Sequence, residues 1–269
     1  MIFERIYLTE DKVAYIDTYV PDNIYGRKTD ALLVIPGGGY GSVCSDREGE
    51  PIALAFLAKG YATFVLHYSV LERAVFPQPL IEASLAVKHI KDNAEKYFIN
   101  PERIFATGFS AGGHLAASLG ILWDMQEIYD ATGMEYGENK VKGVMPIYPV
   151  ISANVPATHR WSFERICGSE NPDPELLQSY CLENRVNEKT VPMFIVHTAE
   201  DAVVPVRNSL VLADALAKNN ISFELHIYPK APHGMALANE ITSGGNPVWD
   251  VPHNAKWVNE ADEWMKSIK

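Results

Sequence analysis

The clearest candidate for chemistry in the sequence is the segment 108–113, Gly-Phe-Ser-Ala-Gly-Gly, which matches the pattern GxSxG around Ser110. The apolar run Arg103–Thr107 precedes it, and the helical pattern Ala111–Leu122 follows it. A serine on so tight a strand-to-helix turn needs neighbours without side chains, which the two glycines provide. The turn exposes the hydroxyl as a nucleophile. The alternative is a glycine-rich turn without chemistry, but the sequence lacks both the lysine of a phosphate-binding loop and a GxGxxG pattern.

A second glycine-rich loop, Gly37-Gly38-Gly39, directly follows the apolar run Ala31–Pro36. Three glycines allow the backbone to turn its N–H groups into a pocket, where they can stabilise an oxyanion. Alone the motif is weak, because glycine-rich loops after strands often serve only as turns. Together with the serine turn about 70 residues later, it predicts an oxyanion hole formed by the N–H groups of Gly38, Gly39 and Ala111.

A serine hydroxyl becomes a good nucleophile only when a base accepts its proton, and histidine is the usual base. In this strand–turn–helix arrangement an acid and then a histidine follow the serine along the chain. His233 fits that order, since it lies on a Pro/Gly loop after the apolar run Phe223–Tyr228; the alternative is an exposed loop histidine. His253 also follows the serine, but it lies just before the last predicted helix, in a less constrained setting. Four other histidines come too early, and two lie in predicted strands, where we expect packing or solvation: His67, His89, His114 and His159, then His197 and His226.

The carboxylate that orients the histidine is expected in the loop 199–201, between the apolar run Met193–Thr198 and a helix that starts near Pro205. A carboxylate there can accept the imidazole N–H, fix the tautomer and stabilise the imidazolium. Asp201 is preferred because the shorter side chain is the commoner choice. Glu200 is the competitor, and capping of the next helix is the structural alternative for either residue.

Other residues near these motifs have two interpretations. Tyr40 and Arg47 follow the glycine loop. Tyr40 is either a substrate contact or an exposed aromatic residue. Arg47 is either a substrate contact or part of a structural ion pair. The aromatic run 159–163 either lines the substrate pocket or holds a lid in place. Trp257 and Trp264 lie seven residues apart in the last helical pattern, the spacing of a buried stripe, and are assigned to packing.

The elements that must position these residues follow a regular alternation. The segments Glu4–Leu8 and Val13–Val20 alternate polar and apolar residues and predict an antiparallel start. Continuous apolar runs then predict strands covered on both faces at Ala31–Pro36, Tyr61–Leu66, Arg103–Thr107, Gly143–Pro149, Met193–Thr198 and Phe223–Tyr228. Apolar residues at helical intervals predict helices at Pro51–Lys59, Gln78–Phe98, Ala111–Leu122, Val206–Asn219 and Asn254–Ile268. This alternation predicts an α/β fold with a mostly parallel central sheet and helices on both faces.

Two stretches interrupt the alternation. Asp124–Lys140 is polar and acidic, and its carboxylates are expected on a solvated face. Residues 152–190 are rich in Pro, Asn and aromatic residues, and within them Pro174–Arg185 is expected to be a helix. A connection of this length in a compact domain is usually functional or carries helices of its own. We therefore predict one domain over residues 1–269, with residues 152–190 as a small cap over the strand ends.

The composition is that of a globular domain, with 47% hydrophobic and 21% charged residues. The 23 Lys and Arg against 34 Asp and Glu give a net charge of −11, which argues against a general binder of nucleic acid or anionic membranes. Cys44, Cys167 and Cys181 have no metal-binding spacing and are expected to be free thiols in a reducing compartment. The acidic start of the chain is unlike a signal peptide, and no apolar run approaches ~18 residues. A cytoplasmic location without a membrane span is expected.

The sequence resembles the α/β-hydrolase esterases of the acetyl-xylan-esterase-like and hormone-sensitive-lipase-like groups. The matching segments run from about residue 31 to the last helix and are 36–40 (PGGGY), 45–51 (SDREGEP), 108–114 (GFSAGGH), 201–205 (DAVVP) and 233–234 (HG). The resemblance implies an eight-stranded type of sheet, no cofactor, and a triad of Ser110, His233 and Asp201 that forms an acyl-enzyme. Pro36 stands where hormone-sensitive-lipase-like enzymes have histidine before the glycines. This favours the acetyl-esterase-like branch, whose members often act on acylated sugars.

These features together predict a serine carboxylesterase for short acyl esters, with acetylated sugars or oligosaccharides as candidate substrates. A serine peptidase or amidase of the same fold is the alternative among enzymes, although such prolyl-oligopeptidase-like enzymes usually carry a large N-terminal domain. A ligand-binding protein that kept the scaffold is the alternative outside enzymes, although such proteins generally lose a triad member. The expected partner is a small ester, with no metal, nucleic acid or membrane, and a homodimer is compatible with the sequence.

Overall fold

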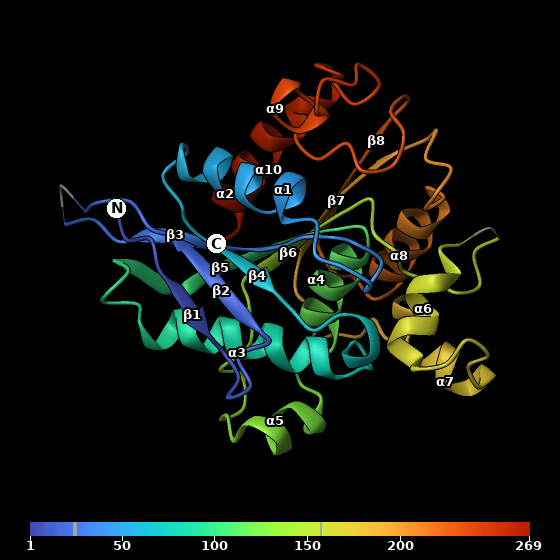
Figure 1. The fold of residues 1–269 in the computed structure, drawn as a ribbon, viewed down its shortest axis with the longest axis horizontal. Coiled ribbons are helices and arrows are strands. Elements are labelled where there is room, and N and C mark those ends of the chain that lie inside the picture. The colour runs from blue at the N-terminus through green and yellow to red at the C-terminus, as the bar shows by residue number, and fades with distance from the viewer. Residues whose placement is uncertain (24–25, 157) are drawn as a thin grey trace.

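The computed structural model describes residues 1–23, 26–156 and 158–269. In these residues one eight-stranded sheet has the order β1-β2-β4-β3-β5-β6-β7-β8, with helices on both faces (Figure 1). The strands are β1 (Arg5–Tyr7), β2 (Tyr15–Tyr19), β3 (Thr29–Ile35), β4 (Ala62–His67), β5 (Ile99–Phe109), β6 (Gly143–Ile147), β7 (Met193–Thr198) and β8 (Phe223–Tyr228). The pairs β1–β2 and β2–β4 are antiparallel, and the other neighbours are parallel. The predicted α/β fold, with its antiparallel start, is confirmed.

The described residues form ten α-helices, six of which overlap predicted helical segments. They are α1 (Ser45–Glu48), α2 (Glu50–Leu57), α3 (Gln78–Asp92), α4 (Ala111–Ile121), α5 (Gln126–Thr132), α6 (Arg160–Cys167), α7 (Pro174–Ser179), α8 (Arg207–Lys218), α9 (Glu240–Ser243) and α10 (Trp257–Ser267), with 3-10 turns η1 (Leu71–Arg73), η2 (Leu182–Asn184) and η3 (Asn254–Lys256). The prediction for α3 was too long at its C-terminus. There the Asn93 amide donates to the carbonyl oxygen of His89, and Phe98 has a positive φ of 52°. The chain therefore turns into β5 while Ala94 and Tyr97 stay buried.

Two hydrophobic cores enclose the sheet. One lies on the face covered by α3, α4 and α8, and the other on the face covered by α2 and α10. β3 shows why its apolar run is continuous: Leu32 and Val34 belong to the second core, Leu33 to the first, and all three are fully buried. A strand packed on both faces needs apolar residues at every position. Trp257 and Trp264 are buried in the second core, so their assignment to packing is confirmed.

The two stretches that interrupt the alternation carry helices. In Asp124–Lys140, α5 buries Ile128, while the carboxylates of Glu127, Asp130 and Glu135 are exposed, as expected. Residues 152–190 carry α6, α7 and η2, and α6 and α7 lie together at one edge of the molecule (Figure 1). The predicted helix at Pro174–Arg185 is therefore split into α7 and η2.

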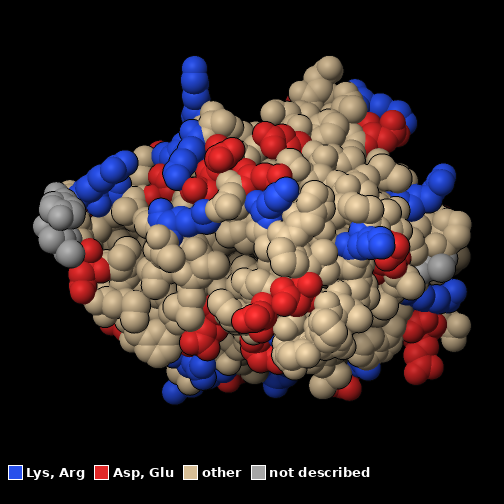
Figure 2. Space-filling view, turned by 90° about the horizontal axis from the view of Figure 1, so that it is seen from above, with Lys and Arg blue, Asp and Glu red and all other residues tan. Residues whose placement is uncertain are grey.

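The surface carries both signs of charge. Lys and Arg side chains are interspersed with Asp and Glu over the face in Figure 2. Within the described residues, no helix is both long and apolar enough to cross a membrane. Cys44, Cys167 and Cys181 are free thiols, as predicted.

A buried histidine ties three segments of the fold together. His114, on α4, accepts a hydrogen bond at Nδ1 from the Tyr40 hydroxyl (2.9 Å) and donates from Nε2 to the carbonyl oxygen of Tyr180 (3.2 Å). We assign these directions because a carbonyl oxygen can only accept. Tyr40 follows the glycine loop and Tyr180 follows α7, so the neutral imidazole joins the glycine loop, α4 and the 152–190 segment. Burial lowers the pKa of His114 to about 4.

The pH dependence of stability follows from this histidine. The unfolded chain takes up a proton near pH 6.5 and the folded chain only near pH 4, so stability is lost as the pH falls through that range. The difference corresponds to at most about 3 kcal/mol. Urea unfolding of the wild type between pH 7 and pH 4 measures the loss. We expect a clearly smaller loss in His114→Gln and an unchanged one in the control His253→Gln, whose side chain is exposed. An equal loss in all three proteins would contradict the assignment.

Candidate active site

Ser110 lies on a strained turn between β5 and α4. Its φ of 55° and ψ of −117° are unusual for a residue with a side chain. A Cβ on Gly108 would lie 2.0 Å from the carbonyl oxygen of Gly112, and one on Gly112 would lie 2.2 Å from that of Ile35. Any larger residue at either position would force these backbones apart. The GxSxG spacing is therefore a steric requirement of this turn.

The three residues predicted as a triad are hydrogen-bonded in line. Ser110 Oγ lies 2.8 Å from His233 Nε2, and His233 Nδ1 lies 2.6 Å from Asp201 Oδ2. The carboxylate accepts from Nδ1–H, so Nε2 of the neutral ring is free to accept the serine proton. Ser110 is 8% exposed, and the Asp201 side chain is fully buried. This arrangement is the one that a nucleophile, a base and an orienting acid require.

Asp201 has a second histidine neighbour that the sequence analysis did not assign to the site. His197 on β7 is fully buried, with Nε2 2.8 Å from the carbonyl oxygen of Val204 and 3.4 Å from Asp201 Oδ2. The other carboxylate oxygen accepts from the N–H groups of Val203 and Val204. Burial opposes ionisation of Asp201, but the His197 and His233 contacts and these N–H groups hold its pKa well below the usual range. Asp201 is therefore a carboxylate at neutral pH.

The glycine loop lies beside the serine. Gly38 and Gly39, with φ of 127° and 63°, line the same cavity as Ser110 and His233. Ala111 begins α4 directly after the serine. Within the described residues, the N–H groups of Gly38, Gly39 and Ala111 donate no hydrogen bond to the protein. Free donors at such a position are what an oxyanion hole needs.

A buried carboxylate, also not assigned by the sequence analysis, connects the glycine loop to the histidine loop. Glu48 Oε2 accepts from the Gly37 N–H (2.9 Å), and Oε1 accepts from the Tyr148 hydroxyl (2.8 Å). That hydroxyl accepts in turn from the Ala236 N–H, and the Tyr148 ring packs edge-on against the His233 imidazole. Burial raises the pKa of Glu48 above the usual range. The only sequence signal for Glu48 is its place in the segment 45–51.

A cavity of about 290 Å³ opens above the triad. Its lining is Gly38, Gly39, Cys44, Arg47, Glu48, Ser110, His159, Trp161, Val203, His233 and Gly234. Arg47 lines the cavity, and its guanidinium lies 4.9 Å over the Trp249 ring. Of the two interpretations of Arg47, this favours a position in the substrate pocket over a structural ion pair. In the run 159–163 both interpretations apply: Trp161 lines the cavity, while Phe163 is buried against His114.

Tyr40 corrects the sequence analysis. It is fully buried and hydrogen-bonded to His114, so it is neither a substrate contact nor an exposed aromatic residue. The loop turns back at Gly38, whose carbonyl oxygen accepts from Gly41 and Ser42, and this points Tyr40 into the core.

The other residues considered for the acid and the base lie outside the site. Glu200, one residue from the aspartate, is exposed, and so is His253, which packs edge-on against Tyr228. His226 lies on β8 beside Glu224, with 27% of its side chain exposed and its ring against Phe194, so it is packed and partly solvated, within the predicted range of packing or solvation. Within the described residues no group of three or more His, Cys, Asp or Glu is arranged to hold a metal.

Fold and geometry together define an α/β hydrolase with a hydrogen-bonded serine, histidine and aspartate. Comparison with known families gives the closer assignment: the chain belongs to the BD-FAE family, whose model matches residues 16–216. The Dienelactone hydrolase family matches residues 168–268. These matches place the chain among the α/β-hydrolase esterases, as the resemblance implied.

Individual relatives agree with this assignment. The chain is 39% identical over 218 residues to Endo-1,4-beta-xylanase B of Butyrivibrio fibrisolvens, covering 79% of this chain and 33% of that protein. It is 28% identical over 266 residues to an Acetylxylan esterase of Xylanibacter ruminicola, covering 97% of this chain and 50% of that protein. The chain thus spans a third to a half of the length of these curated relatives. The structure of an acetyl ester-xyloside bifunctional hydrolase from Caldicellulosiruptor lactoaceticus matches with a TM-score of 0.83 at 33% identity, covering 98% of this chain and 96% of that one.

Substitution of Glu48 tests whether it supports the site. Glu48→Ala leaves the Gly37 N–H and the Tyr148 hydroxyl without their buried acceptor, and we expect a loss of about 2–5 kcal/mol of unfolding free energy. Glu48→Gln keeps an acceptor oxygen for Gly37 and is expected to lose clearly less. Urea unfolding measures both, with Glu263→Gln on the exposed face of α10 as the control. Equal and small losses in both Glu48 variants would show that the carboxylate does not support the loops.

Proposed function

We propose that this chain is a serine carboxylesterase in which Ser110, His233 and Asp201 form the catalytic triad. The observation that carries the proposal is the continuous pair of hydrogen bonds from Ser110 Oγ through the imidazole to Asp201, at the base of an open cavity. The esterase relatives support the reaction class.

In the first half-reaction Ser110 Oγ attacks the ester carbonyl carbon while its proton passes to His233 Nε2. The carbonyl oxygen becomes an oxyanion, for which the N–H groups of Gly38, Gly39 and Ala111 are the proposed donors. The C–O bond to the alcohol then breaks, and the imidazolium returns the proton to the leaving alcohol oxygen. This leaves an acyl-enzyme on the serine.

In the second half-reaction water replaces the alcohol. His233 Nε2 accepts a proton from the water as its oxygen attacks the acyl carbon, and then returns that proton to Ser110 Oγ as the acid leaves. Asp201 stays ionised throughout and stabilises the imidazolium, consistent with its lowered pKa.

We further propose acetylated sugars or oligosaccharides as substrates. Two relatives, an Acetylxylan esterase and an acetyl ester-xyloside bifunctional hydrolase, are named for activity on such esters. The lining of the cavity fits a small acyl group, because Trp161 and Val203 are its main apolar side chains and the rest is polar or glycine.

Replacement of the nucleophile tests the mechanism. We expect Ser110→Ala to abolish labelling by a fluorophosphonate probe and to reduce hydrolysis of 4-nitrophenyl acetate by about a thousandfold or more. Ser118→Ala, the same change two turns further along α4 and away from the cavity, is the control and should keep both. Labelling that persists in well-folded Ser110→Ala would rule out this serine as the nucleophile. No labelling of the wild type would favour a ligand-binding protein.

Acyl-chain length tests the substrate class. A long acyl chain would contact little apolar surface in this cavity, so its transfer from water into the cavity would gain little free energy. We therefore expect kcat/KM for 4-nitrophenyl acetate to exceed that for the octanoate by at least about tenfold. Equal or better hydrolysis of the octanoate would overturn the short-acyl proposal while leaving the serine mechanism intact.

A further inference from the structure

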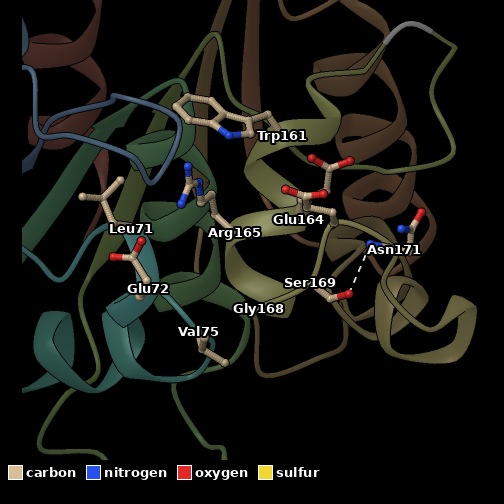
Figure 3. A pocket seen from close by; sticks show the side chains of 10 residues that line it. Leu71, Glu72, Val75, Trp161, Glu164, Arg165, Gly168, Ser169 and Asn171 are labelled. Carbon is tan, nitrogen blue, oxygen red and sulfur yellow. Dashed lines mark hydrogen bonds between the residues drawn. The ribbon is translucent and has the colours of Figure 1, made fainter.

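A second cavity, of about 530 Å³, lies between η1 and α6 (Figure 3). Its walls come from three segments: Leu71, Glu72 and Val75 at η1, then Trp161, Glu164 and Arg165 on α6, and residues 168–171 in the turn that follows. In Figure 3 the Arg165 side chain from α6 extends toward Leu71 and Glu72 at η1, while Glu164 lies further from η1 than Arg165. None of these residues except Trp161 belongs to the cavity above the triad.

Trp161 joins the two cavities. Its side chain lines both, and the residue is 44% exposed. Its ring lies against the glycine loop so closely that a Cβ on Gly41 would be 2.6 Å from Cη2, and one on Gly39 would be 2.8 Å from Cζ3. The Leu71 N–H also donates to the carbonyl oxygen of Tyr40 at the end of that loop (2.8 Å). Trp161 therefore forms a wall that the two cavities share.

The chemistry of this lining suits a polyhydroxyl compound. Carboxylates accept hydrogen bonds from hydroxyl groups, and the Arg165 guanidinium and the Asn171 amide can donate them. The indole of Trp161, 44% exposed, adds apolar surface to the lining, and the Arg165 guanidinium lies over its ring at 5.1 Å. A few polar groups around an aromatic surface are typical of small-molecule sites.

The charge of the lining limits the ligand further. The lining contains three carboxylates, those of Glu72, Glu164 and Glu170, and one guanidinium, that of Arg165. Arg160, 66% exposed at its side chain, pairs with Glu164 from outside the lining and offsets part of that charge. The cavity still keeps an excess of negative charge, which disfavours an anionic ligand.

We propose that this second cavity binds uncharged sugar units of the alcohol part of the ester, with Trp161 as the shared wall between the sugar site and the acyl site. The inference rests on the proposed esterase function and adds the place and the charge preference of the alcohol moiety. Sugars that carry a carboxylate are disfavoured there.

The first test blocks the cavity with a bulky side chain. Val75 is 42% exposed and lies away from the triad, so Val75→Trp fills the space that a sugar would occupy. Leu210→Trp on α8, 44% exposed in the wild type, is the matched control. We expect Val75→Trp to lower the ratio of kcat/KM for an acetylated xylo-oligosaccharide to that for 4-nitrophenyl acetate at least about fivefold, and Leu210→Trp to keep the wild-type ratio. Equal urea midpoints establish that both variants are folded.

The second test measures binding without hydrolysis. Isothermal titration of the wild type with an unacetylated neutral xylo-oligosaccharide should give saturable binding, which Val75→Trp weakens at least about fivefold. If the wild type hydrolyses aryl acetates and acetylated oligosaccharides but Val75→Trp changes neither the ratio nor the binding, the sugar site is wrong and the esterase function stands. If the wild type hydrolyses no ester at all while the oligosaccharide still binds in a Val75-dependent way, the esterase function is wrong instead.

The third test concerns charge. We expect the wild type to prefer a neutral acetylated xylo-oligosaccharide over one bearing a glucuronate group, and Glu72→Lys to reduce that preference at least about threefold. Glu263→Lys, the same charge change on exposed α10, is the control and should retain the preference. Equal activity on both substrates, or no change in Glu72→Lys, would overturn the charge argument.

Discussion

The site depends on one steric constraint: three backbone segments meet where no side chain fits. The end of β3, the end of β5 and the start of α4 approach so closely that Gly108 and Gly112 leave no room for a Cβ. This close approach allows Ser110 its positive φ, and the Ser110 N–H, which donates to the carbonyl oxygen of Ile147, helps to hold the turn. Because the strained turn is surrounded by well-packed core, it persists without distorting the strands that form it.

Buried polar groups then fix the loops around that turn. Glu48 connects the glycine loop to Tyr148 and so to the histidine loop. His197, on β7, contacts Val204 and Asp201, and His114 joins the glycine loop to α4 and the 152–190 segment. Each is almost fully enclosed, so an unmade hydrogen bond would be costly, and the loops are held in one arrangement. The geometry of the triad therefore reflects contacts well outside it.

The 152–190 segment gives the site its walls. Phe163 anchors α6 against His114, while Trp161 on the same helix stands between the two cavities. One face of α6 thus packs into the core and the other faces the openings. A short helix that serves both purposes positions an exposed aromatic residue rigidly, which a free loop could not do.

The sequence by itself determined the parallel sheet, the serine turn, the glycine loop and the order of serine, aspartate and histidine. These depend on local chemistry: glycine spacing, apolar periodicity, and the fact that parallel strands bring their carboxyl ends to one edge. It did not determine that Tyr40 is buried, that α3 ends at Asp92, or that Glu48 and His197 contact the site. Those facts depend on packing between segments far apart in the chain, such as Glu48 with Tyr148 and His114 with Tyr180. Only the tertiary structure decided them, because a side chain's burial and partners are set by neighbours that sequence periodicity does not identify.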